Sequence, residues 1–208
     1  MERQRKAPDV VVRRLPLYLR ALELLDSIDT PIVSSEQLAK MVGTSSNQVR
    51  KDLSYFGVFG KQGVGYQAVS LREELRRILK LKQELRIGLI GAGNLGVALV
   101  RYHQKSRLHQ PLEIAALFDI DDKKVGRKIA DIEVFHLDEL PRIILKLDIK
   151  MMILTFPAVN VQQVVDICVE NGVKSFLNFV PIPLKTPPGV KMQTSDVTLE
   201  LQSLAYYT

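Results

Sequence analysis

The sequence has few of the residues that build disulfides, metal sites and membrane spans. Its 208 residues include a single cysteine, Cys168, which excludes an internal disulfide and a cysteine-based zinc site. The mostly apolar stretch around it predicts a small buried side chain rather than a reactive thiol. No run of about 18 uncharged apolar residues occurs, so we expect no contact with a membrane. Residues 1–6 lack the apolar core of a signal peptide, which predicts a cytoplasmic protein.

The composition is that of a globular chain with an uneven charge. Hydrophobic residues make up 46% of it and the mean hydropathy is +0.04, so it can bury a core and hold at most two ordinary domains. Residues 1–82 contain 15 lysines and arginines against 9 acidic residues, whereas residues 83–208 contain 14 of each. A basic module fused to a neutral one predicts that the first binds a polyanion, with a solvated basic surface as the alternative.

The first helix is expected from a leucine pattern. Residues 1–12 show no clear period and predict a mobile arm. Apolar residues recur from Leu15 to Ile28 at the spacing of an amphipathic helix, with Pro16 tolerated in its first turn. The break at Pro31 ends this helix.

Two short helices then form a helix-turn-helix pattern. Ser34 and Gln37 have the spacing of a capping box, and Gly43 is the expected stop of that helix. Thr44 is the expected cap of a second helix that runs through Tyr55. Two short helices joined by a glycine-bearing turn are typical of DNA-binding domains.

The second short helix is the candidate recognition helix. Val49, Leu53 and Phe56 recur at helical spacing and are expected to face the core. The other face carries polar and basic side chains suited to phosphates and base edges. The predicted DNA-binding residues of this helix are Ser46, Asn47, Arg50, Lys51 and Ser54.

A glycine-rich hairpin over residues 56–66 follows, with Lys61 near its tip. A helix-turn-helix followed by such a hairpin is a winged helix, whose basic tip can reach the DNA backbone or minor groove. The alternative interpretation of this part is a helical lid on an enzyme. A charged amphipathic helix over residues 70–83 is expected to close the domain.

The glycines at 91, 93 and 96 form a dinucleotide-binding motif in its expected context. A buried strand over 86–90 precedes them and a helix over 95–105 follows. The first glycine allows the tight turn, the second lets the backbone approach a pyrophosphate at the helix N-terminus, and the third lets helix and strand pack closely. The predicted cofactor contacts are Gly91, Ala92, Gly93, Asn94, Leu95 and Gly96.

Strands and helices alternate after Leu85, which predicts an α/β domain with a parallel sheet and a cofactor crevice at the carboxyl ends of the strands. The expected strands are 86–90, 113–118, 132–136, 149–154, 174–178 and 190–194. The expected helices are 95–105, 138–146, 159–171 and 198–207.

Asp119 is the predicted partner of the adenosine ribose. It closes a strand and lies 23 residues after Gly96, where the motif places an acidic residue. A carboxylate there repels a 2′-phosphate and so favours NAD(H) over NADP(H). Asp121 and Asp122 are the alternatives. The basic residues that weaken this preference are Lys123, Lys124 and Arg127.

Two other strand ends are expected near the nicotinamide side of the crevice. Thr155 and Pro157 follow the fourth strand, and Asn178 ends the fifth. Simple termination of a strand by proline is the alternative. About 125 residues after Leu85 leave no room for a substrate domain, and the histidines give poor support for an acid–base residue. We therefore expect no catalytic residue and no metal site.

The chain as a whole resembles the redox-sensing transcriptional repressors called Rex. The resemblance runs from the first helix to the end. Its most specific segments are 34–38, 48–57, 63–66, 91–96, 118–121, 177–179 and 199–202, in the family's order and spacing.

The resemblance implies a homodimer whose winged helices bind a palindromic operator in the NAD+ or apo state. NADH binding is then expected to rotate the subunits and release the DNA. It also implies that the last helix, residues 197–207, is exchanged between subunits. The apolar residues available for that exchange are Leu199, Leu201, Leu204 and Tyr206.

The resemblance further implies a switch that links Arg20, Tyr102 and Asp196. An arginine–aspartate pair that changes partners with cofactor state is a plausible bistable element. Some family members place a phenylalanine beside the nicotinamide where this chain has Val197. We expect the smaller side chain either to weaken the selection for NADH or to shift the contact with the nicotinamide ring to another residue.

The sequence thus predicts a winged helix-turn-helix domain over 1–82, a Rossmann-type NAD(H)-binding domain over 83–194 and a dimerisation helix over 195–208. The expected function is that of a repressor sensing the NADH/NAD+ ratio. The alternative is a small NAD-dependent oxidoreductase or cofactor-binding subunit.

Overall fold

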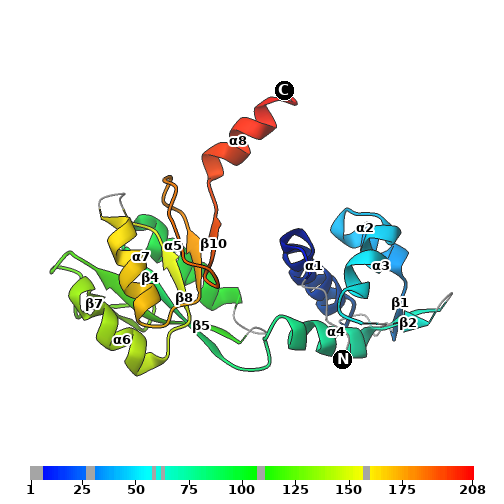
Figure 1. Ribbon diagram of the computed structural model, residues 1–208, viewed down its shortest axis with the longest axis horizontal. Coiled ribbons are helices and arrows are strands. Elements are labelled where there is room, and N and C mark those ends of the chain that lie inside the picture. The colour runs from blue at the N-terminus through cyan, green and yellow to red at the C-terminus, as the bar shows by residue number, and fades with distance from the viewer. Residues whose placement is uncertain (1–6, 27–30, 58–59, 62–63, 107–110, 157–159) are drawn as a thin grey trace. The chain divides into compact units, whose positions relative to one another are not determined.

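The chain divides into two compact units, residues 1–83 and 84–208, which are described separately (Figure 1). The structure is a computed structural model, and it describes residues 7–26, 31–57, 60–61, 64–106, 111–156 and 160–208. No helix in these ranges is long and apolar enough to cross a membrane.

The first helix of the N-terminal unit begins earlier than expected. Helix α1 spans Asp9–Asp26, so part of the predicted arm is helical and Pro16 lies in the helix interior rather than in its first turn. The carbonyl of Pro8 accepts the N–H groups of Val11 and Val12 at 2.9 and 3.2 Å, which starts the helix. Val11 is buried and continues the apolar face four residues before Leu15, a period that the short Val-rich run concealed. Pro16 is on the exposed side, where solvent can satisfy the carbonyl that lacks its helical donor.

The two helices of the helix-turn-helix are confirmed, with one change of cap. Helix α2 spans Ser35–Val42; Ser34 and Gln37 form the expected capping box, and Gly43 ends it in the left-handed conformation with φ of 72°. Helix α3 spans Ser46–Ser54, and its cap is Ser45 rather than Thr44. The N–H of Thr44 instead donates to the carbonyl of Ala39 at 3.0 Å, so this residue still belongs to the end of α2.

A small antiparallel sheet completes the winged helix. Strands β2 (Gly60–Lys61) and β3 (Gly65–Gln67) form the hairpin, and β1 (Ile32–Val33) pairs with β3 on its other side. The sequence did not predict β1, because two residues are too few to show a strand period. Helix α4 (Ala68–Ile78) follows β3 directly and contributes Leu71 and Leu75 to the core. That core also includes the expected Val49 and Leu53, with Phe56 packed against it.

The second unit is the expected Rossmann fold. Its sheet has the order β10-β9-β8-β4-β5-β7-β6, and all neighbours are parallel except β6 and β7. The chain therefore reverses its direction of winding between β4 and β8, as in dinucleotide-binding folds. The predicted strands are observed as β4 (Leu85–Ile90), β5 (Leu112–Asp119), β7 (Ile132–His136), β8 (Met151–Leu154), β9 (Ser175–Asn178) and β10 (Lys191–Thr194). The antiparallel β6 (Lys128–Ile129) was not predicted, again because it is only two residues long.

Helices cover both faces of this sheet. Helices α6 (Leu140–Leu147) and α7 (Val161–Glu170) share one apolar cluster with β4, β5, β8 and β9, whereas α5 (Asn94–Ser106) packs in a second cluster on other residues of β4 and β5. The helix expected over 138–146 begins as a short 3₁₀ turn, η2 (Leu137–Glu139), before α6. Cys168 is fully buried in α7, and burial raises the pKa of its thiol to about 12, which agrees with a packing role.

Candidate functional site

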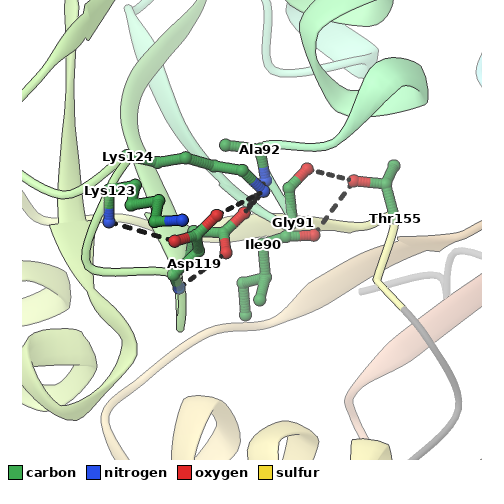
Figure 2. A network of polar contacts seen from close by, with 8 residues as sticks. Ile90, Gly91, Ala92, Asp119, Lys123, Lys124 and Thr155 are labelled. Atoms are coloured by element: carbon green, nitrogen blue, oxygen red, sulfur yellow. Dashed lines mark hydrogen bonds and ion pairs between the residues drawn. The ribbon is translucent and has the colours of Figure 1, made fainter.

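The glycine loop lies at the switch point between β4 and β8. Thr155, the first residue after β8, donates its backbone N–H to the carbonyl of Ile90 at 2.9 Å. Its Oγ1 lies 3.0 Å from that oxygen and 2.9 Å from the carbonyl oxygen of Gly91 (Figure 2). The hydroxyl carries one hydrogen and so donates to one of them at a time. Thr155, a predicted cofactor contact, therefore ties the start of the loop to the neighbouring strand.

The three glycines of the loop differ in their surroundings. Gly91 has φ of +101°, and an added Cβ would lie 2.9 Å from the backbone nitrogen of Phe156. A Cβ on Gly96 would lie 2.0 Å from the carbonyl oxygen of Gly91. A Cβ on Gly93 would meet nothing within 4 Å. The first and third glycines are thus required by the fold, whereas the second faces open space where a ligand can approach the backbone.

Helix α5 begins directly after this open position. The carbonyl of Gly93 accepts the N–H of Val97 at 2.9 Å, which closes the first helical turn. Gly93, Asn94 and Leu95 are exposed, whereas Ala92 and Gly96 are buried. The first N–H groups of a helix have no acceptor within it and carry partial positive charge. This arrangement suits a phosphate, so the residues present fit the pyrophosphate of a dinucleotide.

Asp119, at the end of β5, fixes the other side of the loop. Its Oδ2 accepts the backbone N–H of Ala92 at 2.8 Å and the Lys124 ammonium at 2.9 Å, and its Oδ1 accepts the N–H of Asp121 at 3.0 Å (Figure 2). Burial alone would raise the pKa of this carboxyl, but the hydrogen bonds from Lys124 and from the two backbone groups lower it. Asp119 is therefore an anion at neutral pH and lies beside the expected cofactor site.

For Pro157 and Asn178, the remaining predicted cofactor contacts, the structure gives less direct support. Pro157 lies outside the described residues. Asn178 is fully buried; its side chain accepts the N–H of Val180 at 2.9 Å and donates to the carbonyl of Val180 at 3.0 Å. It also lies 3.4 Å from Thr194 Oγ1. The amide of Asn178 thus fixes the turn after β9, and a contact with the cofactor remains a prediction.

The predicted recognition face of α3 is open to solvent. Asn47, Arg50, Lys51 and Ser54 are exposed and Ser46 is half-buried. Arg50 donates to Ser35 Oγ at 2.7 Å and also contacts Asn47 Oδ1. The guanidinium is therefore held in place on the surface between α2 and α3. The backbone of Lys61 lies in β2, whereas its side chain is outside the described part of the chain.

The buried face of α3 carries a carboxylate that the sequence did not single out. Asp52 is fully buried and accepts hydrogen bonds from Arg14 Nε at 2.5 Å and Nη2 at 2.8 Å. The Tyr18 hydroxyl donates to it at 2.8 Å and Gln48 Nε2 at 2.7 Å. Arg14 and Tyr18 lie one turn apart on α1, and Gln48 and Asp52 lie one turn apart on α3. The sequence signal for this network is these two pairs of polar residues, each one helical turn apart on a helix face that is otherwise apolar.

These contacts determine the charge of Asp52. Burial alone would raise its pKa, but the hydrogen bonds from Arg14, Tyr18 and Gln48 outweigh burial and lower the pKa below its ordinary value. Burial, together with the bond to Asp52, raises the pKa of Tyr18. Asp52 is therefore charged at neutral pH and ties the recognition helix to α1 through a charged hydrogen-bond network.

The predicted switch residues lie on both units. Arg20 is exposed on α1, and Tyr102 is exposed on α5. Asp196 caps the last helix, α8 (Val197–Ala205): its carboxylate accepts the N–H groups of Thr198 at 2.9 Å and Leu199 at 3.3 Å. Every residue of α8 is exposed. The exposed apolar side chains on and just after it are Val197, Leu199, Leu201, Leu204, Tyr206 and Tyr207.

A winged helix joined to a dinucleotide-binding fold defines a class of DNA-binding proteins that respond to a nucleotide. Residues 6–54 match a family model described as "Putative DNA-binding protein N-terminus", and residues 82–182 match one described as "CoA binding domain". A redox-sensing transcriptional repressor Rex from Natranaerobius thermophilus is 41% identical over 207 residues, which cover 100% of this chain and 94% of that protein.

Solved structures agree with this likeness. A chain described as RSP in complex with β-NAD+ and operator DNA is 35% identical, with a TM-score of 0.88, and the match covers 97% of this chain and 92% of that one. RSP in complex with β-NADH is 33% identical with a TM-score of 0.83, over 96% and 93% of the two chains. The chain therefore belongs to the Rex family of redox-sensing transcriptional repressors. It is a transcription regulator and not an enzyme.

Replacement of Asp52 with asparagine is predicted to lower the free energy of unfolding by about 3 kcal/mol at neutral pH, because the neutral amide removes the charged partner of Arg14 and replaces one of the two acceptor oxygens with an NH2 donor. The pKa of Asp52 is lower in the folded state than in the unfolded state. Its carboxylate therefore stabilises the fold fully at pH values above the unfolded-state pKa of about 3.9, and this stabilisation is lost as the pH falls through the folded-state pKa. The difference from wild type should thus be constant between pH 7 and 5 and shrink below about pH 4.

Urea unfolding followed by circular dichroism measures this difference. Glu36→Gln, which removes one exposed carboxylate from α2, is the matched control and should change stability by less than about 0.5 kcal/mol. An Asp52→Asn protein as stable as this control would contradict the role of the network.

The glycine loop gives a second stability prediction. Gly96→Ala should lower the stability of the nucleotide unit by about 2 kcal/mol, because its methyl group meets the Gly91 carbonyl. Gly93→Ala should change it by less than about 0.5 kcal/mol, since its methyl group enters open space. Thermal unfolding of the two variants is the measurement, and equal losses would argue against distinct roles.

Proposed function

We propose that this protein is a repressor that binds operator DNA in its NAD+ or apo state and is released by NADH. The observation that carries the proposal is that RSP, which has this fold over almost the whole chain, was crystallised with β-NAD+ and operator DNA and also with β-NADH. In this proposal the nucleotide is a signal and undergoes no reaction. A regulator of this kind works where operator DNA and the NAD(H) pool occur together, so we place it in the cytoplasm.

Residues 83–194 hold NAD(H) in this proposal. The open position at Gly93 and the first turn of α5 receive the pyrophosphate. Asp119 accepts a hydrogen bond from the adenosine ribose, for which its charge and its place at the end of β5 are suited. Thr155, Pro157 and Asn178 follow the central strands and line the nicotinamide side.

Residues 1–82 bind the DNA. Helix α3 enters the major groove, where Arg50 and Asn47 face base edges and Lys51 neutralises a phosphate. Ser46 and Ser54 add polar contacts at the two ends of the helix, and Lys61 on the wing reaches the neighbouring backbone. The Asp52 network supports this function because it sets the position of α3 on the rest of the unit.

The repressor acts as a homodimer on a palindromic operator. Residues 195–208 supply the dimerisation helix, which is exchanged between subunits. The support for the exchange is that α8 has no buried residue, and that Leu199, Leu201 and Leu204 on it and Tyr206 just after it are exposed, a surface that a partner subunit would cover. Two winged helices related by a two-fold axis match the symmetry of a palindrome.

The change of state is carried by a bistable ion pair. The switch links Arg20, Tyr102 and Asp196, and the arginine and the aspartate change partners with the state of the cofactor. Asp196 lies next to Val197, so a nicotinamide that contacts Val197 can move the cap of α8. A valine offers less contact than an aromatic ring and would give a smaller difference between NADH and NAD+.

A titration of operator binding against the NADH/NAD+ ratio tests the function. A palindromic duplex should bind at moderate salt with NAD+ and dissociate as NADH replaces it, and coenzyme A should have no such effect. Failure to bind any palindromic duplex, or equal affinity with the two nucleotides, would refute the repressor. Turnover of NADH with a hydroxy or keto acid would instead support an oxidoreductase.

The same titration tests the recognition helix. Arg50→Ala and Lys51→Ala should each weaken operator binding about tenfold without changing the affinity for NADH, and loss of Lys51 should lower the salt slope by about one. Lys146→Ala is the control, because it removes an exposed lysine from α6 of the other unit. A parallel loss of NADH affinity would contradict a separate DNA-binding face.

Asp196→Asn tests the switch better than alanine, because asparagine still caps a helix. The variant should keep α8 and bind NADH normally, but NADH should release DNA less completely since the charge is lost. Asp138→Asn, at an exposed carboxylate of η2, is the control. A normal response to NADH in the Asp196→Asn protein would exclude Asp196 from the switch.

A further inference from the structure

The candidate ribose site contains a cation as well as the expected anion. Lys124 Nζ lies 2.9 Å from Asp119 Oδ2 and 3.9 Å from Asp121 Oδ2. The side chain of Lys124 is 36% exposed, whereas that of Asp119 is 9% exposed. Figure 2 shows this ammonium at the same carboxylate oxygen that accepts the N–H of Ala92. Lys124 is thus a partly exposed positive charge paired with an almost buried negative one.

The contacts of Asp119 limit what a ribose can use. A carboxylate offers about four acceptor positions. Ala92 and Lys124 occupy the two positions on Oδ2, and the N–H of Asp121 occupies one on Oδ1. One position on Oδ1 stays open for a hydroxyl group. A second ribose hydroxyl must therefore take the place of Lys124 or lie against its ammonium.

The charge of the pair also differs from that of a lone carboxylate. An unpaired Asp119 would strongly repel a 2′-phosphate, because both groups are anions in a partly desolvated site. With Lys124 attached, the Asp119–Lys124 pair is neutral, and Asp121, 3.9 Å from the ammonium, leaves the three groups with one net negative charge instead of two. The exposed end of the pair is the ammonium, which attracts phosphate oxygens.

We propose that Lys124 sets how strictly this site separates NAD(H) from NADP(H), by neutralising Asp119 where the 2′ substituent is bound. The inference rests on the proposed binding of NAD(H) to this unit. Asp119 provides the preference for a 2′-hydroxyl, and Lys124 reduces that preference. The basic residues of this turn thus have unequal roles, because only Lys124 is paired with Asp119 among the contacts of the described residues.

The test compares the affinities of NADH and NADPH in the full-length protein, measured from nicotinamide fluorescence. The ratio of the two dissociation constants isolates the 2′ position, because the pyrophosphate and nicotinamide are common to both. Lys124→Gln should raise the ratio of the NADPH to the NADH constant by about tenfold, the effect of one charge-assisted contact. Lys124→Arg keeps the charge and should keep the ratio of wild type.

Lys123→Gln is the matched control. It removes the same charge from the adjacent residue, which contacts Asp121 through its backbone N–H and has an exposed side chain. Its ratio should stay within about twofold of wild type, since among the described residues no ion pair joins its ammonium to Asp119 and an exposed charge is screened by salt. An unchanged or lower ratio in Lys124→Gln, or an equal rise in Lys123→Gln, would overturn the inference.

A second measurement applies if the wild-type protein binds NADPH too weakly for its dissociation constant to be determined. In an Asp119→Asn protein the repulsion is removed, and Lys124→Gln added to it should weaken NADPH binding about tenfold. No loss in that double variant would also overturn the inference. A wild-type protein that binds neither nucleotide would refute the proposed function, and the inference with it, whereas NADH binding with an unchanged ratio refutes the inference alone.

Discussion

The Gly91 carbonyl oxygen and the α carbon of Gly96 leave no room for a side chain between them. This close approach brings the start of α5 against the end of β4, at the point where the sheet reverses its winding. Thr155 then ties the loop to β8 and Asp119 ties it to β5. With these three attachments in place, Gly93 faces open space. The candidate cofactor site of the nucleotide unit therefore depends on the close approach of Gly91 and Gly96.

A buried carboxylate has a similar structural role in each of the two units. Asp119 holds the glycine loop through a backbone N–H, and Asp52 holds the recognition helix through Arg14, Tyr18 and Gln48. Both have lowered pKa values because hydrogen bonds outweigh their burial. In each unit a buried charge thus connects the scaffold to the element expected to contact the ligand, which makes the position of that element specific.

The sequence predicted the elements whose signals are local. The capping box at Ser34, the glycine stop at Gly43 and the strand before Gly91 all depend on neighbours within a few residues, and each is present. Errors arose where the signal was too short or not local. The two-residue strands β1 and β6 are too short to show a period. Pro16 predicts a helix start close to it, whereas α1 begins at Asp9 and buries Val11. Thr44 has the residue type of a helix cap, but Ser45 provides the cap.

The sequence by itself determined the family, the order of domains and the residues of the glycine motif, because these are written in spacing along the chain. The tertiary structure alone decided which polar groups meet. Asp52 and Arg14 are hydrogen-bonded although they lie 38 residues apart in the sequence, and Asp119 and Ala92 although they lie 27 residues apart. No pattern among neighbouring residues specifies such pairs. The tertiary structure also separated the glycine that faces a ligand from the two that pack, since only folding brings Gly91 against Gly96 and leaves Gly93 open.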